Sequence, residues 1–458
     1  MSQRKTGIVV LAAGLGTRMK SALPKVMHPV AGRPMIAHLL AGLAELSPDR
    51  LVVVIGEEME AVERAVAPHP TVVQAQRLGT GHAVLAAREV MAGFDGDVLI
   101  VYGDTPLLSS ATLARMLEAR RSAPEPAVVV LGFRPDDPGA YGRLIEGADG
   151  GLDAIVEAKD ATPEQRAVGL CNSGVMAVDG TRLYGLLDRV GNANAKGEYY
   201  LTDIVALARA DGLACRIVEG DEAELIGVNS RAELAVAERI VQEQLRARAM
   251  AAGATLTDPA SVFFCHDTRL GRDVVVGPFV VFGPGVSVAD GVEIRGFCHL
   301  EGMSVATGAL VGPFARLRPG ALIGPGAHIG NFVEIKNASV ESGAKVNHLT
   351  YIGDARVGAG ANVGAGTITC NYDGFFKDHT DIGAGAFIGS NTSLVAPVRI
   401  GAGAIVGAGS VVARDVPGDA LALTRGPLTE KQGWARDFRE RRAAERATKA
   451  ASSPSHKS

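Results

Sequence analysis

The chain has 458 residues, 47% of them hydrophobic and 21% charged, with a formal net charge of −4 at pH 7. This length exceeds one comfortable hydrophobic core, so we expect at least two domains, and the charge balance gives no whole-protein case for nucleic-acid binding. The 57 glycines exceed the usual share of ~7% and require a structural cause.

The cysteines and the N-terminus indicate the cellular compartment. Scattered cysteines without CxxC spacing predict reduced thiols in a cytoplasmic protein, rather than a disulfide framework or a zinc site; they are Cys171, Cys215, Cys265, Cys298 and Cys370. The apolar stretch after Arg4 and Lys5 ends at Gly14 and makes a poor signal peptide. No run approaches about 18 apolar residues, so we expect no membrane span.

Residues 1–229 alternate between strand-like and helix-like patterns. Short apolar, β-branched runs occur from Ile8, at 51–56, 98–104 and 127–133, with helical patterns at 34–46, 82–92 and 110–121. Such runs fit strands buried on both faces of a mostly parallel sheet. We therefore expect an α/β domain with a Rossmann-like sheet, whose ligands bind beyond the carboxyl ends of the strands.

Residues 230–251 are predicted to form a helical linker arm between domains. Ser230 and Glu233 have the spacing of a capping box, and an apolar stripe runs through Leu234, Val241 and Leu245.

A six-residue repeat explains the glycine excess over residues 252–433. Aliphatic or aromatic residues recur from Leu270 through Leu300, from Val305 through Val363, and again from Ile382 to Val412, often followed by glycine. This period predicts a parallel β-helix, in which each short strand points one side chain inward. The phase breaks between Val363 and Ile382, so we expect a functional loop there. Residues 434–458 form a basic tail whose composition predicts disorder.

The stretch LAAGLGTRMKSALPK (11–25) predicts a phosphate site. Met19 occupies the third glycine position of a dinucleotide fingerprint, and no P-loop motif is present. A backbone nest with Arg18 and Lys25 suits a triphosphate that gains charge during transfer. The alternative for the loop alone is an ordinary strand–helix turn with surface cations.

Longer motifs carry a family resemblance. The Gly14 loop and VYGDTPL (101–107) resemble sugar-phosphate nucleotidyltransferases. With QAQRLGTGHA (74–83), GPFARLRPGA (312–321), NHLTYIGDA (347–355) and GAGTITCNYDG (364–374), residues 6–434 resemble the bacterial bifunctional N-acetylglucosamine-1-phosphate uridylyltransferases and glucosamine-1-phosphate acetyltransferases. The resemblance implies two-step synthesis of UDP-N-acetylglucosamine: acetyl transfer in the C-terminal domain, then uridylyl transfer from UTP in the N-terminal domain.

The resemblance implies these roles in the first half. Arg18 and Lys25 would act in catalysis, and Asp104 with Asn229 would hold Mg²⁺. The residues implied to bind UTP or the UDP-sugar are Leu11, Gly14, Lys25, Gln74, Gly79, Thr80, Gly142, Glu157, Asn172 and Asn229. Among them, Gln74 and the Gly79–Thr80 turn would read uracil, because an amide can pair with an imide edge.

In the second half, the resemblance makes His348 the base that takes a proton from the amine of glucosamine 1-phosphate. That substrate would be bound by Arg318, Lys336, Tyr351 and Asn362. Acetyl-CoA would face Ala365, Asn371, Tyr372, Ser390, Ala408 and Arg425. Arg318 and Lys336 lie 18 residues apart, one full coil by the six-residue count, which supports a shared face independently of the resemblance.

The family's β-helix is left-handed and forms a homotrimer, and both properties are expected here through the resemblance alone. The expected partners are small-molecule substrates and further copies of the chain, without nucleic acid or a membrane span. One alternative is a single-activity nucleotidyltransferase whose β-helix only oligomerises or regulates. Another is a non-catalytic sensor of sugar nucleotides, which would require losses at Arg18, Lys25 or Asp104, and none is lost.

Overall fold

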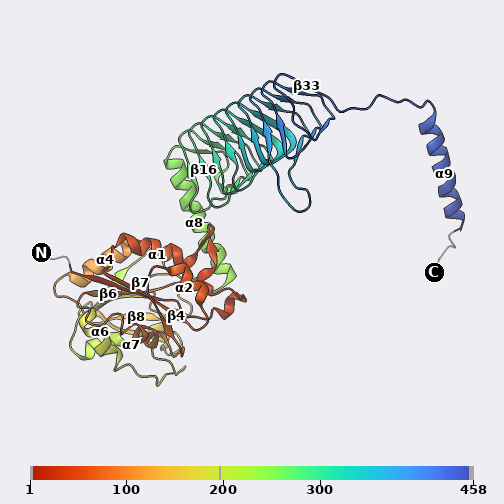
Figure 1. Cartoon of the computed structure of the whole chain (residues 1–458). Coiled ribbons are helices and arrows are strands. Elements are labelled where there is room, and N and C mark those ends of the chain that lie inside the picture. The colour runs from red at the N-terminus through yellow and green to blue at the C-terminus, as the bar shows by residue number, and fades with distance from the viewer. Residues whose placement is uncertain (1–3, 195–196, 453–458) are drawn as a thin grey trace. The chain divides into compact units, whose positions relative to one another are not determined.

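The computed structural model describes residues 4–194 and 197–452. By compactness the chain divides into two units, Met1–Ser304 and Val305–Ser458. The first unit holds an α/β sheet, the long helix α8 and the first coils of a β-helix, and the second holds the later coils and the tail (Figure 1). The domain boundaries expected from the sequence lie elsewhere, where the α/β pattern gives way to the helix and then to the six-residue repeat. Those boundaries stay predictions.

The α/β sheet is mostly parallel, as predicted. Its strand order is β11-β7-β10-β6-β1-β4-β5, and β8 joins β10 and β9 at one side. The strands are β1 (Thr6–Leu11), β4 (Arg50–Gly56), β5 (Thr71–Gln74), β6 (Asp97–Tyr102), β7 (Val128–Phe133), β8 (Arg143–Glu146), β9 (Leu152–Val156), β10 (Cys171–Asp179) and β11 (Cys215–Glu219). Strand β1 pairs in parallel with β4 and β6, whereas β10 is antiparallel to β6 and β7. The connections diverge on either side of β1, and a crevice opens at such a switch point.

Helices cover both faces of this sheet (Figure 1). They are α1 (Met35–Glu45), α2 (Glu60–Val66), α3 (Thr80–Ala86), α4 (Ser110–Arg121), α5 (Pro163–Arg166), α6 (Gly180–Leu187) and α7 (Asp203–Ala210), with a small hairpin of β2 (Pro29–Val30) and β3 (Arg33–Pro34). Along β1 the buried side chains alternate between two cores: Ile8 and Val10 pack with α1, α2 and α4, whereas Val9 and Leu11 pack with α3, α6 and α7. The alternation follows from the two-residue period of a strand.

One predicted helix is shorter than expected. The pattern at 82–92 predicts a helix of that length, but α3 covers Thr80–Ala86. From Ala87 the amide groups of Ala87 and Arg88 bond to carbonyls three residues back, and Gly93 has a φ of 69°. The tighter bonding ends the regular helix, and a left-handed glycine then turns the chain toward β6.

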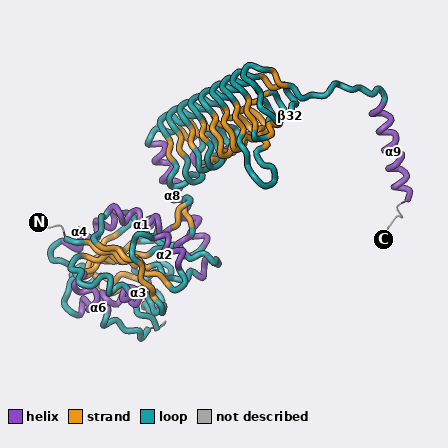
Figure 2. Tube along the Cα trace, in the orientation of Figure 1, coloured by secondary structure: helices purple, strands orange, loops and turns teal. Residues whose placement is uncertain are grey.

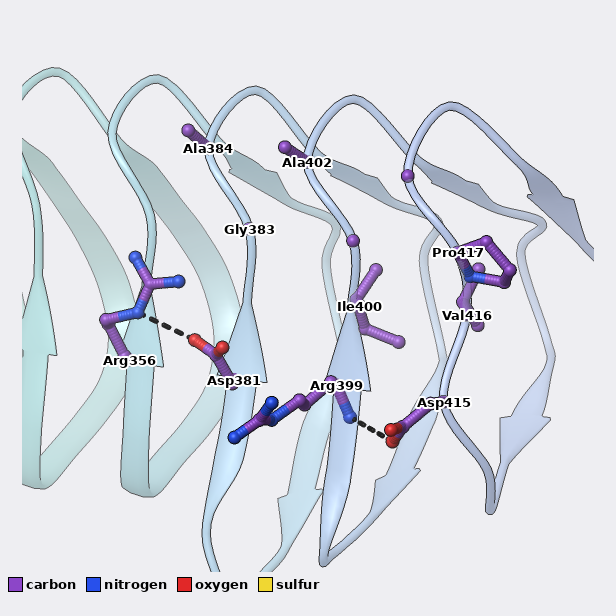
Figure 3. A pocket seen from close by; sticks show the side chains of 12 residues that line it. Arg356, Asp381, Gly383, Ala384, Arg399, Ile400, Ala402, Asp415, Val416 and Pro417 are labelled. Atoms are coloured by element: carbon purple, nitrogen blue, oxygen red, sulfur yellow. Dashed lines mark hydrogen bonds and ion pairs between the residues drawn. The ribbon is translucent and has the colours of Figure 1, made fainter.

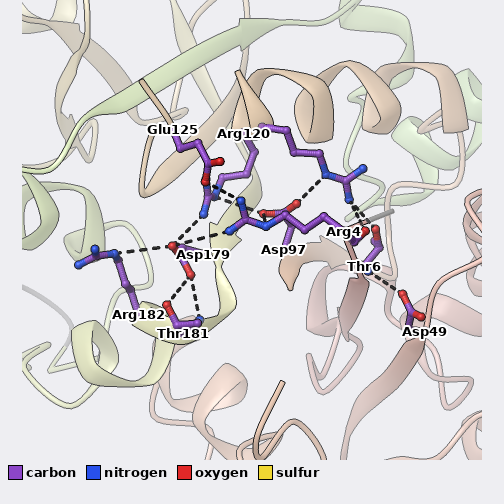
Figure 4. Close-up of polar contacts among 10 residues, drawn as sticks. Arg4, Thr6, Asp49, Asp97, Arg120, Glu125, Asp179, Thr181 and Arg182 are labelled. Atoms are coloured by element: carbon purple, nitrogen blue, oxygen red, sulfur yellow. Dashed lines mark hydrogen bonds and ion pairs between the residues drawn. The ribbon is translucent and has the colours of Figure 1, made fainter. Parts of the chain in front are cut away.

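A buried cluster of charges, drawn in Figure 4, lies at the amino end of β6, the end opposite to the carboxyl edge of the sheet. Asp97 begins β6, is fully buried and forms ion pairs with Arg121 at 2.7 Å and Arg4 at 3.3 Å. Arg120, which is 1% exposed, pairs with Asp179 at 2.8 Å. A buried charge is costly unless it is paired, so these contacts bind the chain start, α4 and β10 together. They stabilise the end of the sheet that carries no predicted site residue.

Helix α8 (Arg231–Ala251) confirms the helix predicted over residues 230–251, and its role as an arm between domains stays a prediction. Ser230 Oγ accepts a hydrogen bond from the Glu233 amide at 3.3 Å, as a helix cap does. The Glu233 carboxylate, however, bonds to the Asn229 amide at 2.7 Å, so the reciprocal half of the expected capping box falls one residue earlier. Val241 is buried, and Leu234 and Leu245 pack on the same cluster.

The six-residue repeat forms the predicted left-handed parallel β-helix, seen as a stack of short strands in Figure 2. Its strands are β12 (Thr255–Leu256), β13 (Arg269–Leu270), β14 (Val275–Val276), β15 (Val281–Phe282), β16 (Ser287–Val288), β17 (Glu293–Ile294), β18 (His299–Leu300), β19 (Ser304–Val305), β20 (Leu310–Val311), β21 (Arg316–Leu317), β22 (Leu322–Ile323), β23 (His328–Val340), β24 (Lys345–Val357), β25 (Asn362–Val363), β26 (Ile368–Cys370), β27 (Thr380–Ile382), β28 (Phe387–Ile388), β29 (Ser393–Val395), β30 (Val398–Ile400), β31 (Ile405–Val406), β32 (Val411–Val412) and β33 (Leu421–Ala422). Three strands make one coil, because β13 pairs with β16 and β28 with β31. Apart from the half-buried Leu270, the predicted inward residues from Val276 to Val412 are buried.

The loop between Val363 and Ile382 is shorter than predicted. Thr369, six residues after Val363, keeps the inward position and is 1% exposed. Its hydroxyl accepts from the Gly353 amide at 2.8 Å, so a polar side chain replaces the aliphatic one without breaking the stack. Residues 371–379 therefore form the loop, which closes where the Asp378 amide donates to the Asn371 carbonyl at 2.9 Å.

The tail differs from the expected disorder, because Trp434–Ser452 form helix α9. Its described side chains from Phe438 to Thr448 are exposed, so composition correctly indicated a segment without a core but not its helical backbone. Within residues 4–194 and 197–452, no helix combines the length and apolarity needed to span a bilayer.

Candidate functional sites

The crevice at the carboxyl ends of β1, β5 and β6 contains a cavity of about 250 Å³. Seven predicted residues line it: Leu11, Gly14, Lys25, Gln74, Gly79, Thr80 and Asp104. They come from three strand–helix connections that lie far apart in the sequence. The sheet thus brings together residues whose spacing alone could not have placed them side by side.

Two glycines let the chain close around this cavity. Gly16 has a φ of 61°, and a Cβ there would lie 2.5 Å from Lys25 Cβ. Gly79 has a φ of 109°, and a Cβ there would lie 2.6 Å from the Tyr199 carbonyl oxygen. A side chain at either position would force the backbone or its neighbour to move. Glycine is thus required at both positions, because neighbouring atoms approach too closely to leave room for a side chain.

Lys25, Asp104 and Asn229 form a candidate cation site at the cavity, which Lys25 and Asp104 line. Lys25 Nζ donates to the Asp104 carboxylate and, at 3.0 Å, to Asn229 Oδ1. The Lys25 and Asp104 side chains are only 13% and 15% exposed. Two hard oxygen ligands therefore converge on one positive group, and carboxylate and amide oxygens are the ligands that Mg²⁺ prefers. The predicted pair of metal ligands fits the ion chemically.

Other predicted residues lie outside this cavity lining. Arg18 belongs to the short helix η1 (Thr17–Met19) and is exposed. Gly142, Glu157 and Asn172 form a separate group: the Asn172 amide donates to the Gly142 carbonyl at 2.8 Å, and a Cβ on Gly142 would lie 3.6 Å from Glu157 Oε1. Glu157 also lines a second cavity of about 370 Å³.

Tyr102 and Arg77 were missed by the sequence reasoning. Tyr102 lines the cavity, and its pKa is raised by burial and by the charges of Asp104 and Glu157, so its hydroxyl stays protonated. Arg77 lines the same cavity, and its Nε donates to the Ala13 carbonyl at 2.9 Å. Tyr102 stands inside the VYGDTPL motif and Arg77 inside the QAQRLGTGHA motif, so both could have been chosen from the sequence.

His348 is oriented by a residue one coil away. Its Nδ1 lies 2.6 Å from Asn331 Oδ1, and the amide oxygen can only accept, so Nδ1 carries the proton. The other ring nitrogen, Nε2, is then an acceptor, as a general base requires. Asn331 was missed, although the register pairs it directly with His348 and the 17-residue spacing could have found it.

The corner that carries His348 continues along the later coils. The Gly366 amide donates to the His348 carbonyl at 3.1 Å, Asn391 to Ala365 at 2.7 Å, and Gly409 to Ser390 at 2.8 Å. Predicted acetyl-CoA residues Ala365, Ser390 and Ala408 therefore belong to one stacked column. Arg425 is exposed beside this column, with Nη2 3.3 Å from where a Cβ on Gly407 would lie.

The next corner carries a cluster of cations. Arg318 and Lys336 occupy adjacent coils, since the Arg318 amide donates to the Ile335 carbonyl at 2.9 Å, which confirms the one-coil spacing. The neighbouring Lys377 ammonium, with smaller contributions from desolvation and Arg318, lowers the pKa of Lys336. Lys336 and Lys377 thus act on each other as like charges, while Arg318 pairs with Glu334 at 2.7 Å, and the three cations form a candidate anion site. Lys377 was missed, because it lies in the loop of residues 371–379, where the six-residue period gives no position for a side chain.

The remaining predicted residues flank these two corners. Asn371, which is 8% exposed, donates to the Asp354 carboxylate beside the cation cluster, and the exposed Tyr372 follows it. Tyr351 lies on the strand between the corners, paired with Glu334 of the coil before. Asn362 pairs with Lys345, on the strand that precedes the His348 corner. Tyr351 and Asn362 thus stand on different faces of the β-helix.

A cavity of about 560 Å³ in the second unit is lined by none of the predicted residues (Figure 3). Charges on successive coils line it: Arg356 Nε pairs with Asp381 at 2.6 Å, and the Arg399 amide donates to Asp415 at 2.8 Å. These contacts join neighbouring coils in the way that cross-strand pairs stabilise a sheet.

Known proteins match both parts of the chain. Residues 8–148 match the MobA-like NTP transferase domain, and residues 379–414 match the bacterial transferase hexapeptide of six repeats. The bifunctional protein GlmU of Paramagnetospirillum magneticum is 67% identical over 98% of this chain and 100% of its own length. That of Rhodospirillum rubrum is 71% identical over 95% of this chain and 97% of its own. The chain belongs to the family of bifunctional GlmU proteins.

Proposed function

We infer that this chain makes UDP-N-acetylglucosamine in two steps, acetyl transfer to glucosamine 1-phosphate followed by uridylyl transfer from UTP. The observation that carries this inference is the presence of two separate constellations, each suited to one of these reactions. One is the cavity beside Lys25, Asp104 and Asn229, and the other is the His348 corner next to a cluster of cations. A β-helix that only oligomerises would need neither a tautomer-fixed histidine nor crowded lysines.

In the uridylyl step, an oxygen of the N-acetylglucosamine 1-phosphate group attacks the α-phosphorus of UTP, the bond to the bridging oxygen breaks, and pyrophosphate leaves. Lys25 and Arg18 offset the negative charge that builds on the phosphates. Asp104 and Asn229 would hold Mg²⁺, which supplies further charge neutralisation when bound. No covalent intermediate is needed, so positioning and electrostatics do most of the work.

Sugar and base are held on either side of the phosphates. Gln74 and the Gly79–Thr80 turn face the uracil, and Thr80 is fixed because its Oγ1 accepts from the Leu201 amide at 3.0 Å. Gly142, Glu157 and Asn172 contact the amino sugar. Tyr102 lines the nucleotide cavity, and the charges of both Asp104 and Glu157 act on it.

In the acetyl step, His348 Nε2 takes a proton as the glucosamine nitrogen attacks the thioester carbonyl carbon, and the carbon–sulfur bond then breaks to release coenzyme A. The substrate's phosphate lies at Arg318, Lys336 and Lys377, one strand away from His348. Tyr351 stands on that strand, so the sugar lies along it. Acetyl-CoA follows the column of Ala365, Ser390 and Ala408, with Asn371, Tyr372 and Arg425 as further contacts.

The acetyl-transfer site is shared between copies of a homotrimer. Asn362 lies on the face before the His348 corner and Tyr351 on the face after it, so one copy does not present both to the same sugar. A neighbouring copy would supply Asn362. The location is cytoplasmic, because all five cysteines are free, as reduced thiols are there.

The test supplies purified protein with glucosamine 1-phosphate, acetyl-CoA, UTP and Mg²⁺ and measures UDP-N-acetylglucosamine. We expect product with the complete mixture and none when acetyl-CoA is omitted, whereas N-acetylglucosamine 1-phosphate should restore product without acetyl-CoA. A chain that uses N-acetylglucosamine 1-phosphate but never acetylates glucosamine 1-phosphate would be a single-activity nucleotidyltransferase.

A further inference from the structure

Gln74 is held in one orientation by two acceptors. It ends β5, is 4% exposed and lines the nucleotide cavity. Its Nε2 donates to the Gly79 carbonyl oxygen at 3.0 Å and lies 3.2 Å from His82 Nδ1. An amide nitrogen carries two protons, and both are used by these contacts. Among residues 4–194 and 197–452, no hydrogen bond uses Gln74 Oε1, which is the atom left for a ligand.

His82 is the second residue that contributes to this orientation. Because Gln74 Nε2 can only donate, His82 Nδ1 must accept, which leaves the ring proton on Nε2. His82 stands on α3 and is half-buried, with its ring 6.3 Å from that of Tyr199. Turning the Gln74 amide over would place Oε1 against the Gly79 carbonyl oxygen, which can only accept, and would require the His82 ring proton to move from Nε2 to Nδ1. The Gly79 contact therefore disfavours the flipped amide, and His82 reinforces that preference while its proton stays on Nε2.

We propose that His82 is a positioning residue that sets the preference for uracil over cytosine by fixing which end of the Gln74 amide faces the base. The proposal rests on the proposed reading of uracil by Gln74. Uracil carries a proton on N3 and donates it to Gln74 Oε1. Cytosine has an unprotonated N3, so the same oxygen faces an acceptor and the pair is repulsive. A buried polar group without a partner is a strong basis for discrimination.

The experiment compares kcat/KM for UTP and for CTP in the full chain and its variants. His82→Leu and His82→Phe remove the acceptor, and His82→Phe keeps a ring against Tyr199. We expect the UTP-to-CTP ratio to fall about tenfold in both, the effect of losing one oriented hydrogen bond. His82→Asn, whose Oδ1 can replace the ring Nδ1 as acceptor, should keep most of the ratio.

Two controls separate positioning from loss of structure. Val84→Ala empties a fully buried position on the same helix and should leave the ratio unchanged even where the rate falls. In a Gln74→Ala background, His82→Phe should not change the ratio further. The thermal unfolding of each variant, followed by circular dichroism, reports whether the α/β domain is folded.

An unchanged ratio in folded His82→Phe, or an equal fall in the Gln74→Ala background, would overturn the role of His82 and leave the proposed function standing. A wild-type chain that does not use UTP would overturn both.

Discussion

The two regions of this molecule build their sites in opposite ways. In the α/β sheet, Lys25 is 79 residues from Asp104 and 204 residues from Asn229 in the sequence. The three side chains meet because parallel strands end at one edge of the sheet. In the β-helix, Asn331 and His348 are 17 residues apart and meet because one coil lies on the next. Sequence spacing therefore carries positional information in the second region and almost none in the first.

Removal of Mg²⁺ tests this separation with the largest expected effect. Chelation with EDTA should reduce uridylyl transfer to background, because Asp104 and Asn229 would face the triphosphate without a cation between them. Acetyl transfer should stay within about twofold, since its charges come from arginine and lysine. The two rates are measured separately, with pyrophosphate and coenzyme A as products. An equal loss of both activities would contradict two independent sites.

His348→Ala breaks the comparison from the other side. It should lower acetyl transfer by about 10²–10⁴, the usual contribution of a general base, and leave uridylyl transfer unchanged. His328→Ala is the matched control, because His328 lies on strand β23, which pairs with the strand β24 that carries His348. His328 pairs with Lys345, on the face before the His348 corner. A normal acetyl-transfer rate in His348→Ala, or a folded but inactive His328→Ala, would refute the assignment of the base.

Arg18→Ala should reduce uridylyl transfer by roughly 10²–10³, the scale seen when one preorganised donor is lost. Lys20→Ala offers a control cation two residues away, also exposed, for which we expect a rate near that of the unchanged chain. Steady-state rates with UTP as the varied substrate decide the matter. Similar losses in both variants would mean that Arg18 acts through general surface charge and not at the phosphates.

The smallest expected effect concerns pH. The pKa of Lys336 is lowered chiefly by Lys377, so its ammonium loses a proton at a lower pH than an ordinary lysine. Binding of the substrate phosphate needs the charged form, so kcat/KM for acetyl transfer should decline on the alkaline side earlier than an isolated lysine would allow. Lys377→Gln should shift this decline to higher pH and weaken binding about tenfold at neutral pH.

Lys345→Gln is the control for that profile, since Lys345 is exposed on the face before the His348 corner. It should leave the alkaline decline where it is. A decline at the same pH in Lys377→Gln as in the unchanged chain would show that another group controls it.

The same contrast explains what the sequence could predict. The inward positions from Val276 to Val412 and the one-coil relation of Arg318 to Lys336 follow from periodicity alone, because each coil repeats one geometry. Asn331 could have been found by the same count. Lys377 could not, because its place depends on how residues 371–379 fold back, and a loop has no period. In the sheet, the members of the cation site were obtained through family resemblance, since local patterns fix strands but not which strand ends meet.

The loop at 371–379 also has a consequence for how such a protein can change. Thr369 pairs with Leu394, 25 residues on, whereas Leu394 pairs with Val412, 18 residues on, and both pairs keep the same register. Seven additional residues are thus accommodated in one coil without displacing those above or below. An insertion or deletion in this loop, whether natural or engineered, can therefore leave the strand pairing of the β-helix unchanged. The residues that the loop brings to Arg318 and Lys336 can therefore change without a change in the number of coils.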